Sequence, residues 1–120
     1  MEFPAPTPRP PYYAVIFTSR RTTNDALGYA VMAQCMLELA ATQPGFLGIE
    51  SVRDADGQGI TVSYWQTLES IHAWGSHAEH RVAQAAGKAK WYEMFQTRSC
   101  RVEHQSYFQR EGRDHGHAAD

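Results

Sequence analysis

The chain has 120 residues, of which 42% are hydrophobic and 20% are charged, and its net charge is −2. This length accommodates one domain with a real core but leaves no room for two domains. The scattered basic residues exclude a nucleic-acid binder, which needs a clustered Lys/Arg surface. No apolar run approaches the ~20 residues that span a bilayer, and no signal-peptide pattern is seen, so a cytoplasmic protein with no membrane partner is expected.

The first half of the chain predicts an arm, a strand and a helix. Residues 1–11 carry five of the six prolines, which fix the backbone and remove donors, and therefore predict an extended arm. Residues 12–19 are β-branched and aromatic and predict the first strand. A helix is expected over about residues 25–42, with a side-chain cap among residues 22–24 and its end set by Pro44.

The second half predicts three strands and one long helix. Residues 46–53 and 58–65 form the second and third strands, which are joined by a tight turn. A second helix is expected over about residues 67–90, and the last strand over roughly 96–108. Residues 109–120 are polar and predict a loose tail.

This β-α-β-β-α-β order predicts an α+β, ferredoxin-like fold: a four-stranded antiparallel sheet with two helices on one face. The opposite face would be left uncovered, and a second copy is expected to bury it in a homodimer. The first helix contains few strongly polar residues, only Gln34 and Glu38, so the arm or a partner is expected to cover part of it. Cys35 and Cys100 are expected to be small buried hydrophobic residues in a reducing compartment.

The run PGFLGIESVRDADGQGITVSYWQTLESIHAW, followed by HAEHRVAQAAGKAKWYEMF, resembles the antibiotic biosynthesis monooxygenase family. The resemblance covers roughly residues 12–108 and is carried best by Pro44–Gly48, Tyr64-Trp65, Trp74 and Trp91-Tyr92. It implies one ferredoxin-like domain over these residues, and dimers whose sheets close into a shared α/β barrel. Members of this superfamily include cofactor-free oxygenases, haem degraders, isomerases and simple ligand binders, so the family leaves the function open.

The second helix carries the main candidates for a site. At ~100° per residue, Trp74, His77 and Arg81 form one line beside the buried stripe and can line a cavity between helix and sheet. His80 is expected to point nearly opposite, towards solvent. The alternative is that Trp74 is ordinary core packing and His77 an ordinary surface residue.

Candidates outside that helix are His104 and three aromatic residues. His104 shares a strand face with Val102, and it is either a base lining the barrel or a dimer-interface residue. Trp65, Trp91 and Tyr92 would give an aromatic wall that suits a flat organic ligand, although the same residues also suit a plain core.

The haem-degrading branch of the superfamily implies a ligand histidine ten residues after the tryptophan of the second helix, and an asparagine on the first strand. Here Gln84 stands ten residues after Trp74, and no asparagine occurs in residues 12–19. A haem cofactor is therefore disfavoured, and haem binding through His77 would need a different geometry. No Zn-site spacing is present, so no metal is expected.

The leading hypothesis is a cofactor-independent monooxygenase that acts on an aromatic or quinol-like small molecule. His77 or His104 would be the base, and Arg81 would stabilise the anion. The aromatic wall would hold the substrate ring. The alternatives are a non-enzymatic dimer that binds a small ligand or supports another protein, and a haem-binding or haem-degrading monooxygenase.

Overall fold

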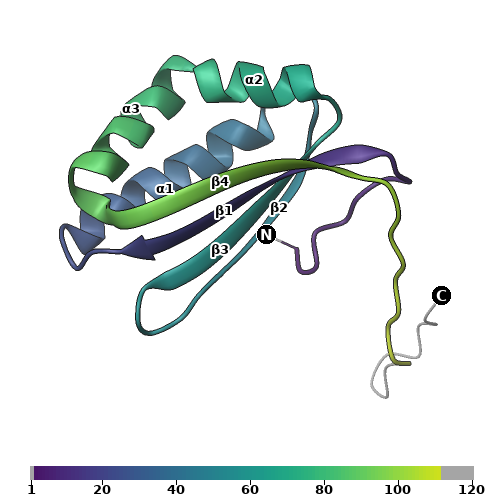
Figure 1. The fold of residues 1–120 in the computed structure, drawn as a ribbon, viewed down its shortest axis with the longest axis horizontal. Helices are drawn as coiled ribbons and strands as arrows, with labels where there is room; N and C mark the ends of the chain where they lie inside the picture. Colours follow the sequence, from purple (N-terminus) through teal and green to yellow (C-terminus); the bar gives the residue numbers. More distant parts are fainter. Residues whose placement is uncertain (1, 112–120) are drawn as a thin grey trace.

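The computed structural model describes residues 2–111 and consists of one sheet with a layer of helices on one side (Figure 1). The sheet order is β2-β3-β1-β4, all antiparallel. The strands are β1 (Tyr12–Arg21), β2 (Phe46–Arg53), β3 (Gln58–Trp65) and β4 (Tyr92–Val102). The helices are α1 (Ala26–Ala41), α2 (Leu68–Ser76) and α3 (Ala78–Ala86), followed by the π-helical turn η1 (Gly87–Trp91). The predicted α+β ferredoxin-like fold is confirmed; residues 112–120 of the predicted tail lie outside the described residues.

The strand register assigns each side chain to one of two sheet faces. Tyr13 of β1 lies opposite Trp65 of β3, and Ala14 lies opposite Tyr64. Successive strand residues point to opposite faces. Because Trp65 stacks with Trp74 of α2, its face is the one that the helices cover. Tyr64 therefore lies on the other face, which is called the open face below.

The prediction of one continuous second helix is wrong. His77 has an extended backbone, with φ −61° and ψ 132°, and it separates α2 from α3. Its Nδ1 accepts a hydrogen bond from the N–H of Glu79 at 3.3 Å, so His77 is the N-cap of α3. The break changes the direction of the chain, and the single helical phase assumed from the sequence does not hold across it.

The first helix begins at a cap one residue later than expected. Asp25, with φ 51°, accepts a hydrogen bond from the N–H of Gly28 through its carboxylate at 3.1 Å. Leu27 and Val31, one turn apart on α1, are 77% and 57% exposed. The arm does not cover them, because it lies on the open face.

The last strand ends earlier than predicted, at Val102 instead of Phe108. Val102 pairs with Tyr12, the first residue of β1, and the residues before Tyr12 are Pro11 and Pro10. Proline has no N–H to donate to a sheet. The alternating pattern therefore continues in the sequence after Val102, but the ladder has no partner strand to continue with.

The proline-rich arm packs on the open face, at the end of the sheet where β1 begins (Figure 1). The N–H of Ala5 donates to the Glu50 carboxylate at 2.7 Å, and the Tyr64 hydroxyl donates to its other oxygen at 2.6 Å. Gly48 lies directly under the arm, where a Cβ would approach the Ala5 methyl group to 3.3 Å. Gln105, which follows β4, also holds the arm, since its amide N–H donates to the Pro8 carbonyl at 3.0 Å.

Little of the apolar content is fully buried within one chain. The buried hydrophobic residues among residues 2–111 are Tyr12, Ala14, Ala40, Trp65 and Trp91. Cys35 and Cys100 are exposed, so the prediction that they are buried is wrong for the single chain. Their positions account for this: Cys35 lies on α1 and Cys100 lies on the open face, opposite Ala14. In the same described range, no helix combines the length and apolarity that a membrane crossing requires.

Candidate functional site

Two tryptophans and two histidines gather between the helix layer and the end of the sheet where β3 finishes, a group called the Trp74 stack (Trp65, Trp74, His77 and His80). Trp65 is the last residue of β3 and is completely buried. Its ring stacks with that of Trp74 at 6.2 Å between centroids. Its indole N–H donates to the Ser63 hydroxyl at 2.9 Å, so the polar atom of this buried ring has a partner.

His80 completes the stack from the first turn of α3. Its imidazole lies almost parallel to the Trp74 ring, 13° from coplanar and 4.2 Å from it. Nδ1 of His80 lies 2.9 Å from the Trp74 carbonyl oxygen. A carbonyl can only accept, so Nδ1 carries the proton and Nε2 holds a free lone pair. Among residues 2–111 no group bonds to that Nε2.

The surroundings of His80 disfavour the charged form of its ring. Burial lowers its pKa from the ordinary value of 6.5, and the neighbouring His77 lowers it further, against the opposing effect of the Trp74 carbonyl. A neutral imidazole with one nitrogen fixed and the other free can act as a proton acceptor. The expectation that His80 points into solvent is wrong, because the break at His77 turns α3 so that His80 lies on Trp74.

His77 joins the stack, and Arg81 lies beside it. The His77 ring is 5.9 Å from Trp74, tilted by 45°. The backbone N–H of Arg81 donates to the His77 carbonyl at 2.9 Å, and the Arg81 side chain is exposed. Of the residues predicted from the sequence, the structure thus brings together Trp65, Trp74 and His77.

Trp91 and Tyr92 belong to a different group at the opposite end of the sheet. Tyr92 pairs with Arg21, whereas Trp65 pairs with Tyr13, near the other end of β1. This second group is called the Trp91 cluster, and its rings are in edge or tilted contact: Phe17, Tyr29, Trp91, Tyr92 and Phe95.

The polar atoms of the Trp91 cluster are bonded within the chain. The Trp91 indole N–H donates to the Asp25 carboxylate at 3.3 Å, and Tyr92 donates to the Tyr29 hydroxyl at 3.5 Å. Burial, followed by that hydrogen bond, raises the pKa of Tyr92 above its ordinary range. The Arg21 guanidinium lies 3.6 Å from the centre of the Tyr29 ring. This cluster connects β1, α1 and β4 and leaves little for a ligand to bind.

His104 does not join either group. It follows the end of β4 and is exposed. Its position two residues after Val102 would have placed it on the open face in any case, because Val102 pairs with Tyr12 on that face. The sheet therefore separates His104 from the Trp74 stack.

The helix layer does not cover the whole of its sheet face. Tyr13 of β1 pairs with Trp65 on one side and with Arg101 of β4 on the other, so Arg101 lies on the helix-covered face. Thr97 and Ser99 alternate with it on the same face, yet all three β4 side chains are exposed. The helices therefore do not seal the face along β4. These side chains present hydroxyl and guanidinium donors on the same sheet face as the stack.

Reasoning from the sequence missed His80, although a signal was present. Ser76 is followed three residues later by Glu79, the spacing of a capping box, inside the stretch that the hydrophobic pattern predicts to be one helix. That pattern indicates a new helix start near residue 77 and changes the phase of every helical residue after it.

A metal site would need a cluster of ligand side chains. Within the described range 2–111, no group of three or more His, Cys, Asp or Glu side chains comes together.

Comparisons with known proteins identify the family and the fold. A family model described as antibiotic biosynthesis monooxygenase matches residues 21–86. The Bacillus subtilis (strain 168) protein YqjZ is 51% identical over 114 residues, which cover 95% of this chain and 99% of that protein.

Among solved structures, the cofactor-independent oxygenase SnoaB of Streptomyces nogalater superposes with a TM-score of 0.68 at 11% identity, covering 81% of this chain and 97% of that one. Rv0793 of Mycobacterium tuberculosis superposes with a TM-score of 0.70 at 8% identity, covering 80% and 99%. At these identities the two structures establish the shared fold.

Proposed function

Because the chain belongs to the antibiotic biosynthesis monooxygenase family, we propose that it is a small cofactor-independent monooxygenase that oxidises an aromatic or quinol-like small molecule. The observation that carries the proposal is the His80 ring held on Trp74, with Nδ1 bonded and Nε2 free. SnoaB, which has the same fold, is a cofactor-independent oxygenase, and this supports the same kind of chemistry for the present chain.

The proposed reaction needs only substrate, O2 and a base. Nε2 of His80 removes a proton from an anthrone-like substrate, and the resulting anion passes one electron to O2. The substrate radical and superoxide then combine to form a C–O bond, and His80 returns its proton to the resulting peroxide anion, which gives a hydroperoxide. The hydroperoxide loses water as its O–O bond breaks, which converts a CH2 group into a carbonyl. The substrate loses four electrons and O2 accepts four, so one oxygen atom enters the product and the other leaves as water.

Each member of the Trp74 stack has a proposed part in this reaction. Trp65 and Trp74 provide an aromatic surface for the substrate ring. His77 fixes the start of α3 and thereby the position of His80. Arg81, in the next turn after His77, is the proposed stabiliser of the substrate anion. His104, Trp91 and Tyr92 are left out of the proposed site because they lie away from the stack.

The proposed protein is a homodimer that packs through its open faces. Val52, Ile60 and Met94 are apolar, lie on the open face and are 62%, 47% and 58% exposed. A single chain buries few apolar residues, so a second copy that covers these exposed side chains stabilises it. Static light scattering at micromolar concentration is expected to give twice the mass of the chain.

Oxygen uptake with a panel of anthrones and hydroquinones tests the enzymatic proposal. Uptake is expected to exceed that of buffer and to fall sharply in His80→Gln, while His104→Gln behaves like the unmodified protein. The two substitutions make the same chemical change, one in the stack and one outside it. Uptake no greater than that of buffer across the panel would favour a protein that only binds ligands.

A further inference from the structure

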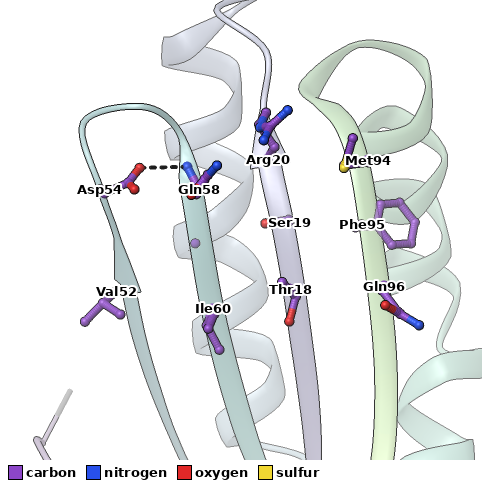
Figure 2. A pocket seen from close by; sticks show the side chains of 11 residues that line it. Thr18, Ser19, Arg20, Val52, Asp54, Gln58, Ile60, Met94, Phe95 and Gln96 are labelled. Carbon is purple, nitrogen blue, oxygen red and sulfur yellow. Dashed lines mark hydrogen bonds between the residues drawn. The ribbon is translucent and has the colours of Figure 1, made fainter.

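The open face has two unlike halves. At the end where β1 begins, the proline-rich arm forms a ridge over Gly48 and Tyr64. At the other end the face is hollowed, with a volume of about 720 Å3 (Figure 2). The hollow is lined by Thr18, Arg20, Val52, Ile60, Met94 and Gln96, among others. These side chains come from all four strands.

We propose that this hollow receives the N-terminal arm of a second copy, led by Phe3. The inference builds on the proposed homodimer and specifies how its two faces fit together. A two-fold axis that lies between the sheets and runs across their strands reverses the strand direction from one copy to the other. The ridge of each copy then faces the hollow of its partner, and both contacts form at once, as an isologous interface requires.

The chemistry of the arm matches that of the hollow. Phe3 is 76% exposed, although it is the largest apolar side chain of the arm. The arm cannot place Phe3 in its own hollow, because the bond from Ala5 to Glu50 and the contacts of Gln105 hold it at the opposite end of the face. Proline-rich segments dock on apolar surfaces with a small loss of conformational entropy, because their backbone is already restricted.

Charge supports the same pairing. Glu2 precedes Phe3 on the arm, and Arg20 lines the hollow. Within its own chain Arg20 makes a long contact to Glu93, 3.8 Å, and its side chain is 41% exposed. In the proposed dimer the Glu2 carboxylate of one copy approaches the Arg20 guanidinium of the other.

Sedimentation equilibrium on the full chain tests the inference with two apolar substitutions and one control. Phe3→Ser and Val52→Asp are each expected to raise the dimer dissociation constant at least tenfold. Leu27→Asp is the matched control, since Leu27 is an exposed apolar residue on α1, on the other side of the sheet, and its dimer is expected to be unchanged. All three side chains are exposed, so circular dichroism is expected to show an unaltered fold.

A charge exchange tests the register. Glu2→Arg and Arg20→Glu are each expected to weaken the dimer a few-fold, as exposed ion pairs do. The double variant is expected to recover most of the loss, because it restores opposite charges across the contact.

The outcomes separate the inference from the proposal beneath it. A chain that sediments as a monomer would overturn the homodimer and the arm contact together. A dimer that Val52→Asp weakens and Phe3→Ser leaves intact would overturn the arm contact alone. A dimer that neither substitution weakens would overturn the packing through the open faces as well. If the double variant lost as much dimer affinity as Glu2→Arg and Arg20→Glu lose together, the placement of Glu2 on Arg20 would be overturned.

Discussion

The Trp74 stack and the Trp91 cluster use the same residue types at opposite ends of one sheet face. In the Trp91 cluster each polar ring atom has a partner within the chain, including the Asp25 carboxylate and the Tyr29 hydroxyl. In the Trp74 stack the buried indole of Trp65 is satisfied, but Nε2 of His80 is left without a partner among residues 2–111. Aromatic content therefore does not distinguish a core from a site, whereas the accounting of polar atoms does.

Replacing the free base is expected to give the largest effect. His80→Gln keeps a side-chain donor near the Trp74 carbonyl but offers no nitrogen lone pair. We expect kcat for the best anthrone substrate to fall by about 10²–10⁴-fold, the usual contribution of a positioned base. Steady-state oxygen uptake measures this, and KM is expected to change less because Trp65 and Trp74 still form the aromatic surface.

Tyr92→Phe provides the matching change in the Trp91 cluster. It removes a hydroxyl whose one partner among residues 2–111 is Tyr29. We expect kcat to stay within about twofold of the unmodified value, because that bond stabilises the fold by only ~1 kcal/mol. If Tyr92→Phe abolished uptake and His80→Gln did not, the functional assignment of the two groups would have to be exchanged.

Truncating the buried tryptophans is expected to lower the stability of both regions by similar amounts. Trp65→Ala and Trp91→Ala each remove a large buried ring and leave a cavity, at a cost of about 3–5 kcal/mol in the free energy of unfolding. Urea denaturation measures the loss. At temperatures where both variants stay folded, we expect only Trp65→Ala to lose substrate binding as well. Equal loss of binding in both would contradict the separation of the two regions.

Hydrophobic pattern and turn chemistry were enough to predict the fold from the sequence. Residues 58–65 alternate between the two sheet faces and are separated from the strand at 46–53 by a turn at Gly57, whose φ of 88° suits glycine. The open face followed from the order of elements. In these strands and in the turn between them, the local preference of the sequence agrees with the tertiary structure, so the sequence is enough to predict the structure.

The site was harder to predict, because it depends on two interruptions of regular structure. The His77 cap shifts the phase of α3, and without that shift His80 appears to face solvent. The end of β4 depends on Pro10 and Pro11, which precede the partner strand β1 and lie about 90 residues earlier in the chain, where no local pattern records them. His104 was mistaken for a strand residue for that reason. Tertiary pairing, and not propensity, decided both cases.

Removing the charge of Asp25 is expected to give a modest effect on the Trp91 cluster. The Trp91 indole, the Lys90 ammonium and the Gly28 N–H hold the pKa of Asp25 below its ordinary value of 3.8. Because the carboxyl has a lower pKa in the folded state than in the unfolded state, its ionised form stabilises the fold at pH values above the unfolded pKa. This contribution is lost as the pH falls through the folded pKa. Asp25→Asn keeps a capping oxygen, so a slightly lower Tm at pH 7 that converges with the unmodified protein in acid is expected from calorimetry.

The smallest expected effect is the pH dependence of stability that His80 contributes to the stack. Its folded pKa lies below the unfolded value of 6.5, chiefly because the ring is buried. The unfolded chain therefore binds more protons between those two pKa values, and stability falls as the pH drops from about 6.5 towards the folded pKa. Urea midpoints of the unmodified protein and of His80→Gln, compared from pH 8 to pH 5, isolate this contribution. The difference between them is expected to be constant above pH 7 and to change below 6.5. A flat difference over the whole range would mean that His80 is as exposed as the sequence first indicated, and the free Nε2 would lose its significance.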